Sequence, residues 1–218
     1  MTWMQQILGQ PLAASHALGI LIGGYVLGCF TTGYYLVRWR LGQDIRDLGS
    51  GSVGARNVGR FMGTPGFVTT LLGDFSKGAV MVLLTLYLTG GDERLAGLAM
   101  LATVLGHVWP LPLGFRGGKG AGTAAGALAI YDIRIGLTGV AILAVLYLFT
   151  RRFTLSGMIA FSCLPLAAMF RKADPLEPAL MSCLAGIILI AHRKNLLEEF
   201  SVLAGRHHDH PNQDQPSE

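Results

Sequence analysis

Residues 49–60 (GSGSVGARNVGR) combine glycine, hydroxyl groups and arginine in a way that suits the binding of an anion. Glycine lets consecutive backbone N–H groups converge on one anion, serine hydroxyls donate further hydrogen bonds, and guanidinium groups pair with phosphate through two parallel hydrogen bonds. The segment predicts a phosphate site, and a flexible loop with ordinary interfacial arginines is the alternative. The residues expected to line the site are Ser50, Gly51, Ser52, Gly54, Arg56, Asn57 and Arg60.

A second glycine-rich segment, residues 115–123 (FRGGKGAGT), leads directly into a run of small apolar residues. A turn made of Gly117, Gly118 and Lys119 at a helix N-terminus brings amide donors, the positive end of the helix dipole and an ammonium group together. It is not a Walker A nucleotide loop, because Gly120 rather than Ser or Thr follows the lysine. The segment predicts a second binding site for a phosphate group.

A third polar segment, residues 192–195 (HRKN), follows the last apolar run of the chain. On a helix His192 and Asn195 are three residues apart and share a face. Both side chains, together with Arg193, are therefore candidates for a site at the membrane surface. Basic side chains that merely extend to the lipid headgroups are the alternative interpretation.

Three further ionisable residues, Asp74, Lys77 and His107, lie within or beside apolar runs. Ionisable groups at membrane depth are costly and mark functional sites by default, so we expect these three to contribute to substrate binding. Two alternatives stay open. Asp74 and Lys77 are three residues apart and can neutralise each other while tethering their helix, and His107 can be a buried structural histidine.

The elements that position these segments are expected to be membrane helices. Apolar residues make up 51% of the 218 residues and charged residues only 14%, a composition typical of polytopic membrane proteins. Residues 18–37 contain no charge and as a helix reach about 30 Å, the thickness of a hydrocarbon core. Further apolar runs cover residues 66–88, 95–113, 121–131, 135–150, 154–170 and 178–191.

The fold expected from these runs is an all-α bundle over residues 1–204. About seven transmembrane helices are expected, and five if the shorter late runs are re-entrant or merge. The 30 glycines indicate helices that approach one another closely. Residues 205–218 are polar and are expected to form a disordered cytoplasmic tail, in which we assign no metal site to His207, His208 and His210.

The distribution of basic residues predicts the orientation. Both helix counts are odd, so the termini lie on opposite sides of the membrane. With the N-terminus outside, 13 of the 17 lysines and arginines fall on the cytoplasmic side, as the positive-inside rule requires. The three polar segments and the C-terminus are then cytoplasmic. Because the positive charge is dispersed between apolar runs, no nucleic-acid partner is expected.

Taken together, the polar segments resemble those of the acyl-phosphate-dependent glycerol-3-phosphate acyltransferase (PlsY) family of bacterial membranes. Residues 49–60 resemble the family pattern GSGNPGATNVLR, and residues 74–78 match D-x-x-KG. Residues 106–120 resemble GH-x-FP…F-x-GGKG, and residues 192–195 match HR-x-N. The resemblance covers residues 18–205.

The resemblance implies an inner-membrane enzyme that transfers a fatty acyl group from acyl phosphate to the 1-hydroxyl of glycerol 3-phosphate. The products are lysophosphatidic acid and phosphate, in the first step of phospholipid synthesis. No cofactor or metal is implied, and a monomer is the expected state. The implied catalytic residues are Arg60, Lys119, His192 and Asn195. Because an acyl phosphate is already activated, positioning and charge neutralisation can supply most of the catalysis, and the proton passes to a substrate phosphate oxygen or to His192.

The chain departs from the family pattern at several positions. Ser52, Val53 and Arg56 stand where the pattern has Asn, Pro and Thr. Residues 150–157 read TRRFTLSG in place of TRYVSLGS, so Thr154 replaces the first serine and Ser156 lies one position before the second. Both hydroxyl residues are expected to line the substrate pocket. An acyltransferase with another acceptor is therefore an alternative.

A transporter or flippase of a phosphorylated small molecule is the alternative from a different class, because the same loops can bind a ligand without transforming it. Transporters often contain internal repeats and bind at the membrane midplane. This sequence has no convincing repeat, and its polar segments are expected at one membrane face. A purely structural membrane protein has no need of three such loops.

Overall fold

The computed structural model describes residues 14–170 and 174–197, and these residues form helices, turns and loops without a strand. The predicted polar tail, residues 205–218, lies outside the described residues and stays a prediction. The helical elements are α2 (Ala14–Cys29), α3 (Thr32–Leu41), η1 (Ile45–Asp47), α4 (Ala55–Thr89), α5 (Glu93–Val108), η2 (Leu111–Leu113), α6 (Ala121–Tyr131), α7 (Ile133–Thr150), α8 (Phe153–Met169) and α9 (Leu176–Ala191).

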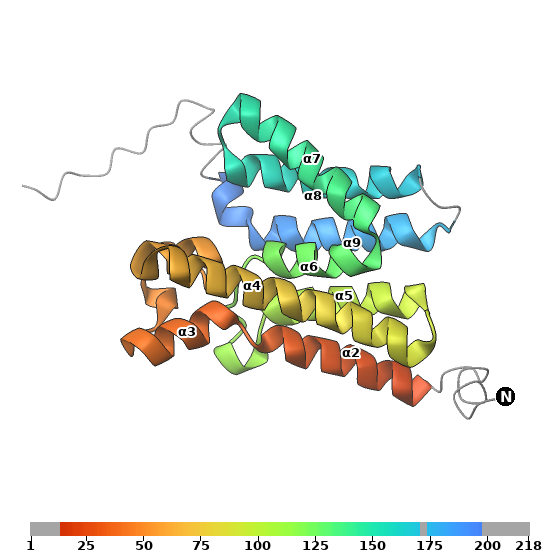
Figure 1. The fold of residues 1–218 in the computed structure, drawn as a ribbon, viewed down its shortest axis with the longest axis horizontal. Coiled ribbons are helices and arrows are strands. Elements are labelled where there is room, and N and C mark those ends of the chain that lie inside the picture. Colours follow the sequence, from red (N-terminus) through yellow and green to blue (C-terminus); the bar gives the residue numbers. More distant parts are fainter. Residues whose placement is uncertain (1–13, 171–173, 198–218) are drawn as a thin grey trace, which may run out of the picture.

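Helices α2 and α4 to α9 lie roughly along one axis, and successive helices run back and forth between the two ends of the bundle (Figure 1). Helix α5 is central, because it packs against α2, α4, α6 and α9. Helix α7 lies at the periphery, and Ile135 is its only buried residue. The predicted all-α bundle is thus confirmed.

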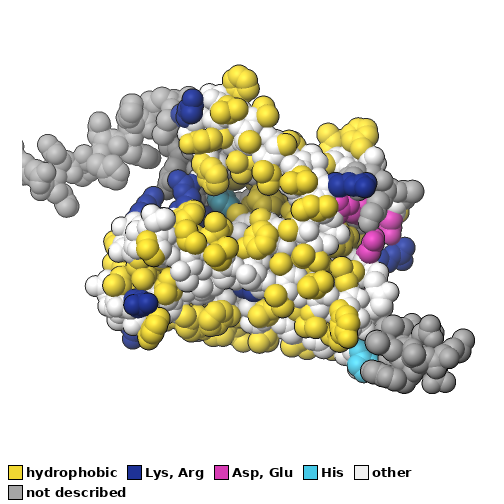
Figure 2. Space-filling view, viewed as in Figure 1, with side chains coloured by type: hydrophobic (Ala, Val, Ile, Leu, Met, Phe, Trp, Pro, Cys, Tyr) yellow, Lys and Arg dark blue, Asp and Glu magenta, His cyan; other side chains and the backbone are white. Residues whose placement is uncertain are grey.

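Among the described residues, four segments are long and apolar enough to cross a membrane: Ala14–Leu41, Ala55–Thr89, Glu93–Leu113 and Ile133–Thr150. Helices α6, α8 and α9 are apolar but shorter. Hydrophobic side chains cover much of the face in Figure 2, as expected for a surface in contact with lipid. In the part of the chain that the structure describes, helices α2 and α4 to α9 agree in number with the seven predicted apolar runs, while seven membrane crossings stay a prediction.

The first predicted span, residues 18–37, is not one continuous helix. The chain leaves the helix after Cys29, and Thr31 has extended backbone angles (φ −90°, ψ 104°) before α3 begins. Three backbone groups at this break are satisfied by side chains of α4, which the sequence periodicity of the first run alone could not reveal. Lys77 Nζ donates to the carbonyls of Gly28 and Phe30, and Asp74 Oδ1 accepts from the N–H of Thr32.

The second predicted span is longer than expected because α4 begins at Ala55. The helix is kinked at Gly63, which has φ 64° and ψ −163°, and Pro65 follows at the start of its second segment. Glycine tolerates the positive φ, and proline suits the first turn of a helix because no intrahelical partner is needed for its nitrogen. The second half of the first glycine-rich segment is therefore helical.

Glycines bring the helices into close contact, as the composition predicted. A Cβ on Gly28 of α2 would overlap the Thr103 carbonyl of α5, and one on Gly106 of α5 would overlap the Tyr25 carbonyl of α2. Helices α4 and α6 approach in the same way, since a Cβ on Gly126 would overlap the Phe75 carbonyl. Close packing of small residues is a main source of helix association in lipid.

Candidate functional site

Asn57, at the start of α4, organises the first glycine-rich loop. Its Oδ1 accepts from the N–H of Ser50, and its Nδ2 donates to the carbonyls of Leu48, Ser52 and Ile45 at 2.9, 2.9 and 3.3 Å. The side chain is only 2% exposed. Both ends of the amide are thus occupied by loop backbone, so this geometry favours a role in shaping the loop over the phosphate contact expected from the sequence.

The remaining predicted residues of this loop lie on its surface. Ser50 and Gly51 are exposed, and Gly51 has φ 68°, a conformation that glycine adopts without strain. Ser52 Oγ accepts from the N–H of Gly54 at 3.3 Å, which closes a local turn before α4 begins at Ala55. The N–H groups of both residues are already used, because Ser50 donates to Asn57 Oδ1 and Gly51 donates to the Leu48 carbonyl. The loop therefore offers a ligand an exposed serine rather than free backbone N–H groups.

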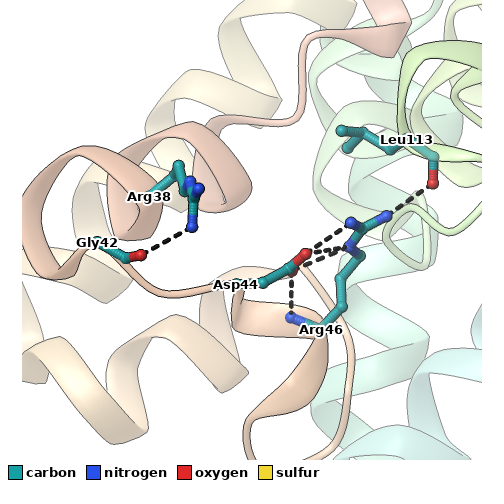
Figure 3. A network of polar contacts seen from close by, with 5 residues as sticks. All are labelled: Arg38, Gly42, Asp44, Arg46 and Leu113. Atoms are coloured by element: carbon teal, nitrogen blue, oxygen red, sulfur yellow. Dashed lines mark hydrogen bonds and ion pairs between the residues drawn. The ribbon is translucent and has the colours of Figure 1, made fainter.

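Arg46, which the sequence analysis did not single out, joins η1, just before this loop, to η2, just before the second glycine-rich segment (Figure 3). Its guanidinium pairs with Asp44 at 2.6 Å and donates to the Leu113 carbonyl in η2 at 2.7 Å. The hydrogen bonds from Arg46 lower the pKa of the Asp44 carboxyl. An acidic and a basic residue separated by one position before a glycine-rich loop is the only sequence signal that could have pointed to this pair.

The Gly117–Gly118 turn lies on the C-terminal end of α5 and leads into α6. The N–H groups of Gly117 and Gly118 donate to the carbonyls of Val108 and His107 at 3.2 and 3.0 Å. Gly120, with φ 80°, is the N-cap of α6. Lys119 therefore lies next to the positive end of the α6 dipole, as the sequence predicted.

Lys119 meets the end of α9. Its Nζ donates to Asn195 Oδ1, across 76 residues of sequence. His192 is 9% exposed, and its Nδ1 contacts the Ile188 carbonyl at 2.8 Å. Because a carbonyl can only accept, Nδ1 carries the proton and Nε2 is the unprotonated nitrogen of the neutral ring.

The environment of His192 favours this neutral form. Burial lowers the pKa of the imidazole from 6.5, the Ile188 hydrogen bond raises it, and the positive charge of Lys119 lowers it. The net direction is downward. At pH 7 His192 can therefore accept a proton at Nε2, which is the property that a general base requires.

Arg56 and Thr154, two positions at which the chain departs from the family pattern, contact each other. Arg56 Nη1 donates to Thr154 Oγ1 at 2.9 Å, and the guanidinium carbon lies 5.4 Å from the centre of the Phe153 ring. The contact joins the start of α4 to the start of α8. Ser156, by contrast, is fully buried and paired with Thr150 Oγ1 at 3.0 Å, so the structure does not direct it toward the loops.

Arg60 is exposed and lines a shallow, open groove along the first turns of α4, formed by Arg56, Gly59, Arg60, Gly63, Thr64 and Phe67. Two guanidinium groups thus face one groove. Arg193 is exposed beyond the end of α9. The described part of the chain contains no group of three or more His, Cys, Asp or Glu side chains arranged to hold a metal ion.

Asp74, Lys77 and His107 form a separate buried cluster, with exposures of 3–5%. Lys77 Nζ lies 3.1 Å from Asp74 Oδ1 and 2.8 Å from His107 Nδ1. The side chains contact one another and the α2–α3 break. Of the two interpretations that the sequence left open for these residues, the contacts favour tethering over direct substrate binding.

The loops that carry most of the predicted site residues gather at one end of the bundle, where α4, α6 and α8 begin and α9 ends (Figure 1). In Figure 2, which has the same view, most of the visible Lys and Arg side chains lie toward this end, whereas the visible Asp and Glu side chains lie at the other. The result is a basic, glycine-rich site beside an apolar bundle surface. Such a site suits an anionic amphipathic ligand.

Comparisons with known proteins agree with the resemblance seen in the sequence. A family model described as glycerol-3-phosphate acyltransferase matches residues 18–201. Glycerol-3-phosphate acyltransferase 1 of Desulfitobacterium hafniense is 40% identical over 182 residues, which is 83% of this chain and 89% of that protein. The glycerol-3-phosphate acyltransferase of Caulobacter vibrioides is 40% identical over 194 residues, covering 86% and 87% of the two chains.

The solved structures agree with the sequence relatives. The crystal structure of PlsY, an integral membrane glycerol 3-phosphate acyltransferase, in its glycerol 3-phosphate form has a TM-score of 0.78 and 30% identity, and the match covers 88% of this chain and 94% of that one. The lysophosphatidic acid form has a TM-score of 0.75. The chain therefore belongs to the glycerol-3-phosphate acyltransferase family of integral membrane proteins.

Proposed function

We propose that this protein transfers a fatty acyl group from acyl phosphate to the 1-hydroxyl of glycerol 3-phosphate at the end of the bundle that carries Lys119. The observation that carries the proposal is the convergence of Lys119, just before α6, with His192 and Asn195, at and just beyond the end of α9, beside the glycine-rich loops. The relatives and solved structures above are named for the same acceptor. We further propose that this end faces the cytoplasm of a bacterial inner membrane.

The reaction needs little from a protein nucleophile. The substrate hydroxyl oxygen forms a bond to the acyl carbonyl carbon, and the bond from that carbon to the phosphate oxygen breaks with its electron pair on phosphate. The hydroxyl proton passes to Nε2 of His192 or directly to a phosphate oxygen. Lys119 and the amide groups at the start of α6 stabilise the negative charge that develops.

The acyl chain is expected to lie along the recess that Figure 2 shows between the upper and lower helices of this face. Helix α6 begins at Ala121, two residues after Lys119, and has small residues near its start. A Cβ on Gly122 would lie 3.6 Å from Leu71 Cδ1 of α4, and Ala125 is exposed. Leu71 and Phe75 of α4 are 39% and 37% exposed beside it. An apolar strip that starts at the cationic site suits a substrate with a phosphate head and a fatty tail.

The contacts made by Arg56 and Thr154, two residues that differ from the family pattern, support glycerol 3-phosphate as the acceptor. Arg56 and Thr154 contact each other at 2.9 Å, so the larger side chain at position 56 has a partner within the chain. The groove in front of it keeps two guanidinium groups, Arg56 and Arg60, which suit the doubly charged phosphate of glycerol 3-phosphate. We therefore propose glycerol 3-phosphate as the acceptor and Arg56 as one of the residues that bind it.

The test is acyl transfer by the purified protein in detergent, with palmitoyl phosphate and labelled glycerol 3-phosphate. The unchanged protein should form lysophosphatidic acid, and Lys119→Ala should lower turnover at least 100-fold. Lys194→Ala is the matched control, because it removes a lysine that is exposed at the same helix end, and it should retain activity within twofold. Absence of product from the folded unchanged protein would contradict the proposal, and other phosphorylated alcohols would then be screened.

A further inference from the structure

The buried cluster of Asp74, Lys77 and His107 connects the broken first helix to the turn that carries Lys119. On one side, Lys77 Nζ donates to the carbonyls of Gly28 and Phe30 at 3.1 and 2.7 Å. On the other side, it lies 2.8 Å from Nδ1 of His107, near the end of α5. One ammonium group thus holds α2, α4 and α5 together at the same level of the bundle.

The protonation of His107 follows from these contacts. The ammonium group of Lys77, paired with Asp74 at 3.1 Å, can only donate, so Nδ1 of His107 accepts and Nε2 carries the proton. The orientation of the imidazole ring is thereby fixed by a group on another helix. A histidine held in this way presents a fixed surface to whatever packs on its Nε2 edge.

Gly118 packs on that edge. A Cβ built on Gly118 would overlap Nε2 of His107, and its three nearest atoms all belong to the His107 ring. The N–H of Gly118 also donates to the His107 carbonyl at 3.0 Å. The residue directly before Lys119 is thus in contact with His107 through both its backbone N–H and its Cα.

We propose that His107 is a positioning residue for Lys119. Its ring, oriented by Lys77, is the surface on which the Gly117–Gly118 turn rests, and this contact sets where the Lys119 ammonium meets Asn195. The proposal rests on the proposed function, because that function places Lys119 at the reacting phosphate. It gives Asp74, Lys77 and His107 a role that does not require any of these three buried side chains to touch a substrate.

A pair of compensating substitutions tests the contact between Gly118 and the His107 ring. Gly118→Ala alone places a methyl group against the His107 ring and should lower kcat at least tenfold. His107→Asn keeps an acceptor near the position of Nδ1 for Lys77 but removes the Nε2 edge, and it should lower kcat about threefold. The double variant has room for the methyl group, and its kcat should exceed that of Gly118→Ala about threefold or more, rising toward that of His107→Asn.

Gly117→Ala is the matched control. A Cβ at Gly117 would overlap the His107 carbonyl and lie close to Pro110 and the Val108 carbonyl, none of which changes in His107→Asn. His107→Asn should therefore give no recovery in a Gly117→Ala background. The proposal would be overturned if the kcat losses of Gly118→Ala and His107→Asn simply multiply in the double variant. It would also be overturned if His107→Asn restores kcat in the Gly117→Ala background as much as in the Gly118→Ala background.

A second readout reports the place of Lys119 without any reaction. The charge of Lys119 lowers the pKa of His192, so a displaced ammonium should let that pKa rise, as measured by NMR titration of the ring. The pKa should rise in Gly118→Ala and return toward the original value in the double variant. An unchanged His192 pKa in all four proteins would overturn the positioning role even if acyl transfer is observed. The expected pKa pattern in a protein that lacks acyl transfer would support the positioning role and contradict only the proposed function.

Discussion

At the scale of single residues, the proposed chemistry depends on which nitrogen of His192 is free. The Ile188 carbonyl accepts from Nδ1, and burial lowers the pKa of the ring, so Nε2 is an unprotonated acceptor at neutral pH. Lys119 donates to Asn195, and its charge adds to burial in disfavouring the imidazolium form of His192. Substitution of Lys119 therefore also changes the titration of His192.

Substitution of His192 by asparagine distinguishes the role of Nδ1 from the role of Nε2. Asparagine can keep a donor near the position of Nδ1 for the Ile188 carbonyl, but it has no group at the position of Nε2. If His192 accepts the hydroxyl proton, kcat should fall about 100-fold in steady-state assays while the melting temperature stays within a few degrees. Near-normal turnover would assign the proton to a substrate phosphate oxygen instead.

The pH dependence follows from the direction of the pKa shift. Lys119 disfavours the imidazolium form, so Lys119→Ala should raise the pKa of His192 relative to the unchanged protein. NMR titration of the histidine rings measures this shift, and the spectrum of His192→Asn identifies the signal. In the unchanged protein, the acidic limb of kcat/KM should have an apparent pKa below 6.5, because activity is lost only when Nε2 becomes protonated. A limb above 6.5 would exclude neutral His192 as the group that titrates.

At the scale of the elements, the helices meet through glycine, and this makes their spacing sensitive to a single methyl group. Gly28 on α2 contacts the Thr103 carbonyl of α5, whereas a Cβ on Gly19 of the same helix would have no atom within 4 Å. The two glycines thus differ in packing but share a helix.

Alanine at these two positions should therefore have opposite effects on stability. Gly28→Ala forces α2 away from α5 and should cost about 1–3 kcal/mol. Gly19→Ala should be neutral or slightly stabilising, because alanine has a higher helix propensity than glycine. Thermal unfolding in detergent, followed by circular dichroism, measures both. An equal loss of stability in both variants would contradict the close approach of α2 and α5 at Gly28.

The sequence predicted the elements better than it predicted the breaks within them. Apolar runs indicated the helices, because the absence of charge is a property of each run by itself. The break after Cys29 depends on Lys77 and Asp74, some 45 residues away, and only the tertiary contact reveals it. The longer start of α4 was missed because a segment of glycine and arginine has the composition of a loop.

For the candidate site, the sequence likewise predicted the loops better than it predicted the role of each residue in them. Glycine with lysine or arginine was a sufficient signal for the loops around Ser50 and Lys119, since these residue types suit phosphate wherever they are placed. It could not distinguish a group that faces a ligand from one that holds the loop. Asn57 has its amide occupied by loop backbone, and Arg46, which joins the two loops, was not identified at all.

At the scale of the whole molecule, charge and apolar surface divide the bundle into functional ends. Basic groups gather where α4, α6 and α8 begin, and visible acidic groups gather at the opposite end (Figure 2). On the basis of the positive-inside rule, we propose that the basic end faces the cytoplasm. Substrates made in the cytoplasm would then reach the site without crossing the membrane.

Thiol labelling tests this orientation. Gln43 is exposed in the loop after α3, and Glu93 is exposed at the start of α5 at the opposite end. In a background in which Cys29, Cys163 and Cys183 are replaced by alanine, Glu93→Cys should react with a membrane-impermeant maleimide in intact cells. Gln43→Cys should react only after the membrane is permeabilised. The reverse pattern would place the proposed site outside.

The bond between Lys119 and Asn195 has a consequence for how the protein is made. The two partners lie 76 residues apart, and the histidine beside Asn195 belongs to the last helix described. A nascent chain that has already inserted α2 to α8 still lacks His192 and Asn195, two of the residues proposed to act on the substrates. Activity should therefore appear only after α9 has docked against α5 and α8, once all the described helices are in place.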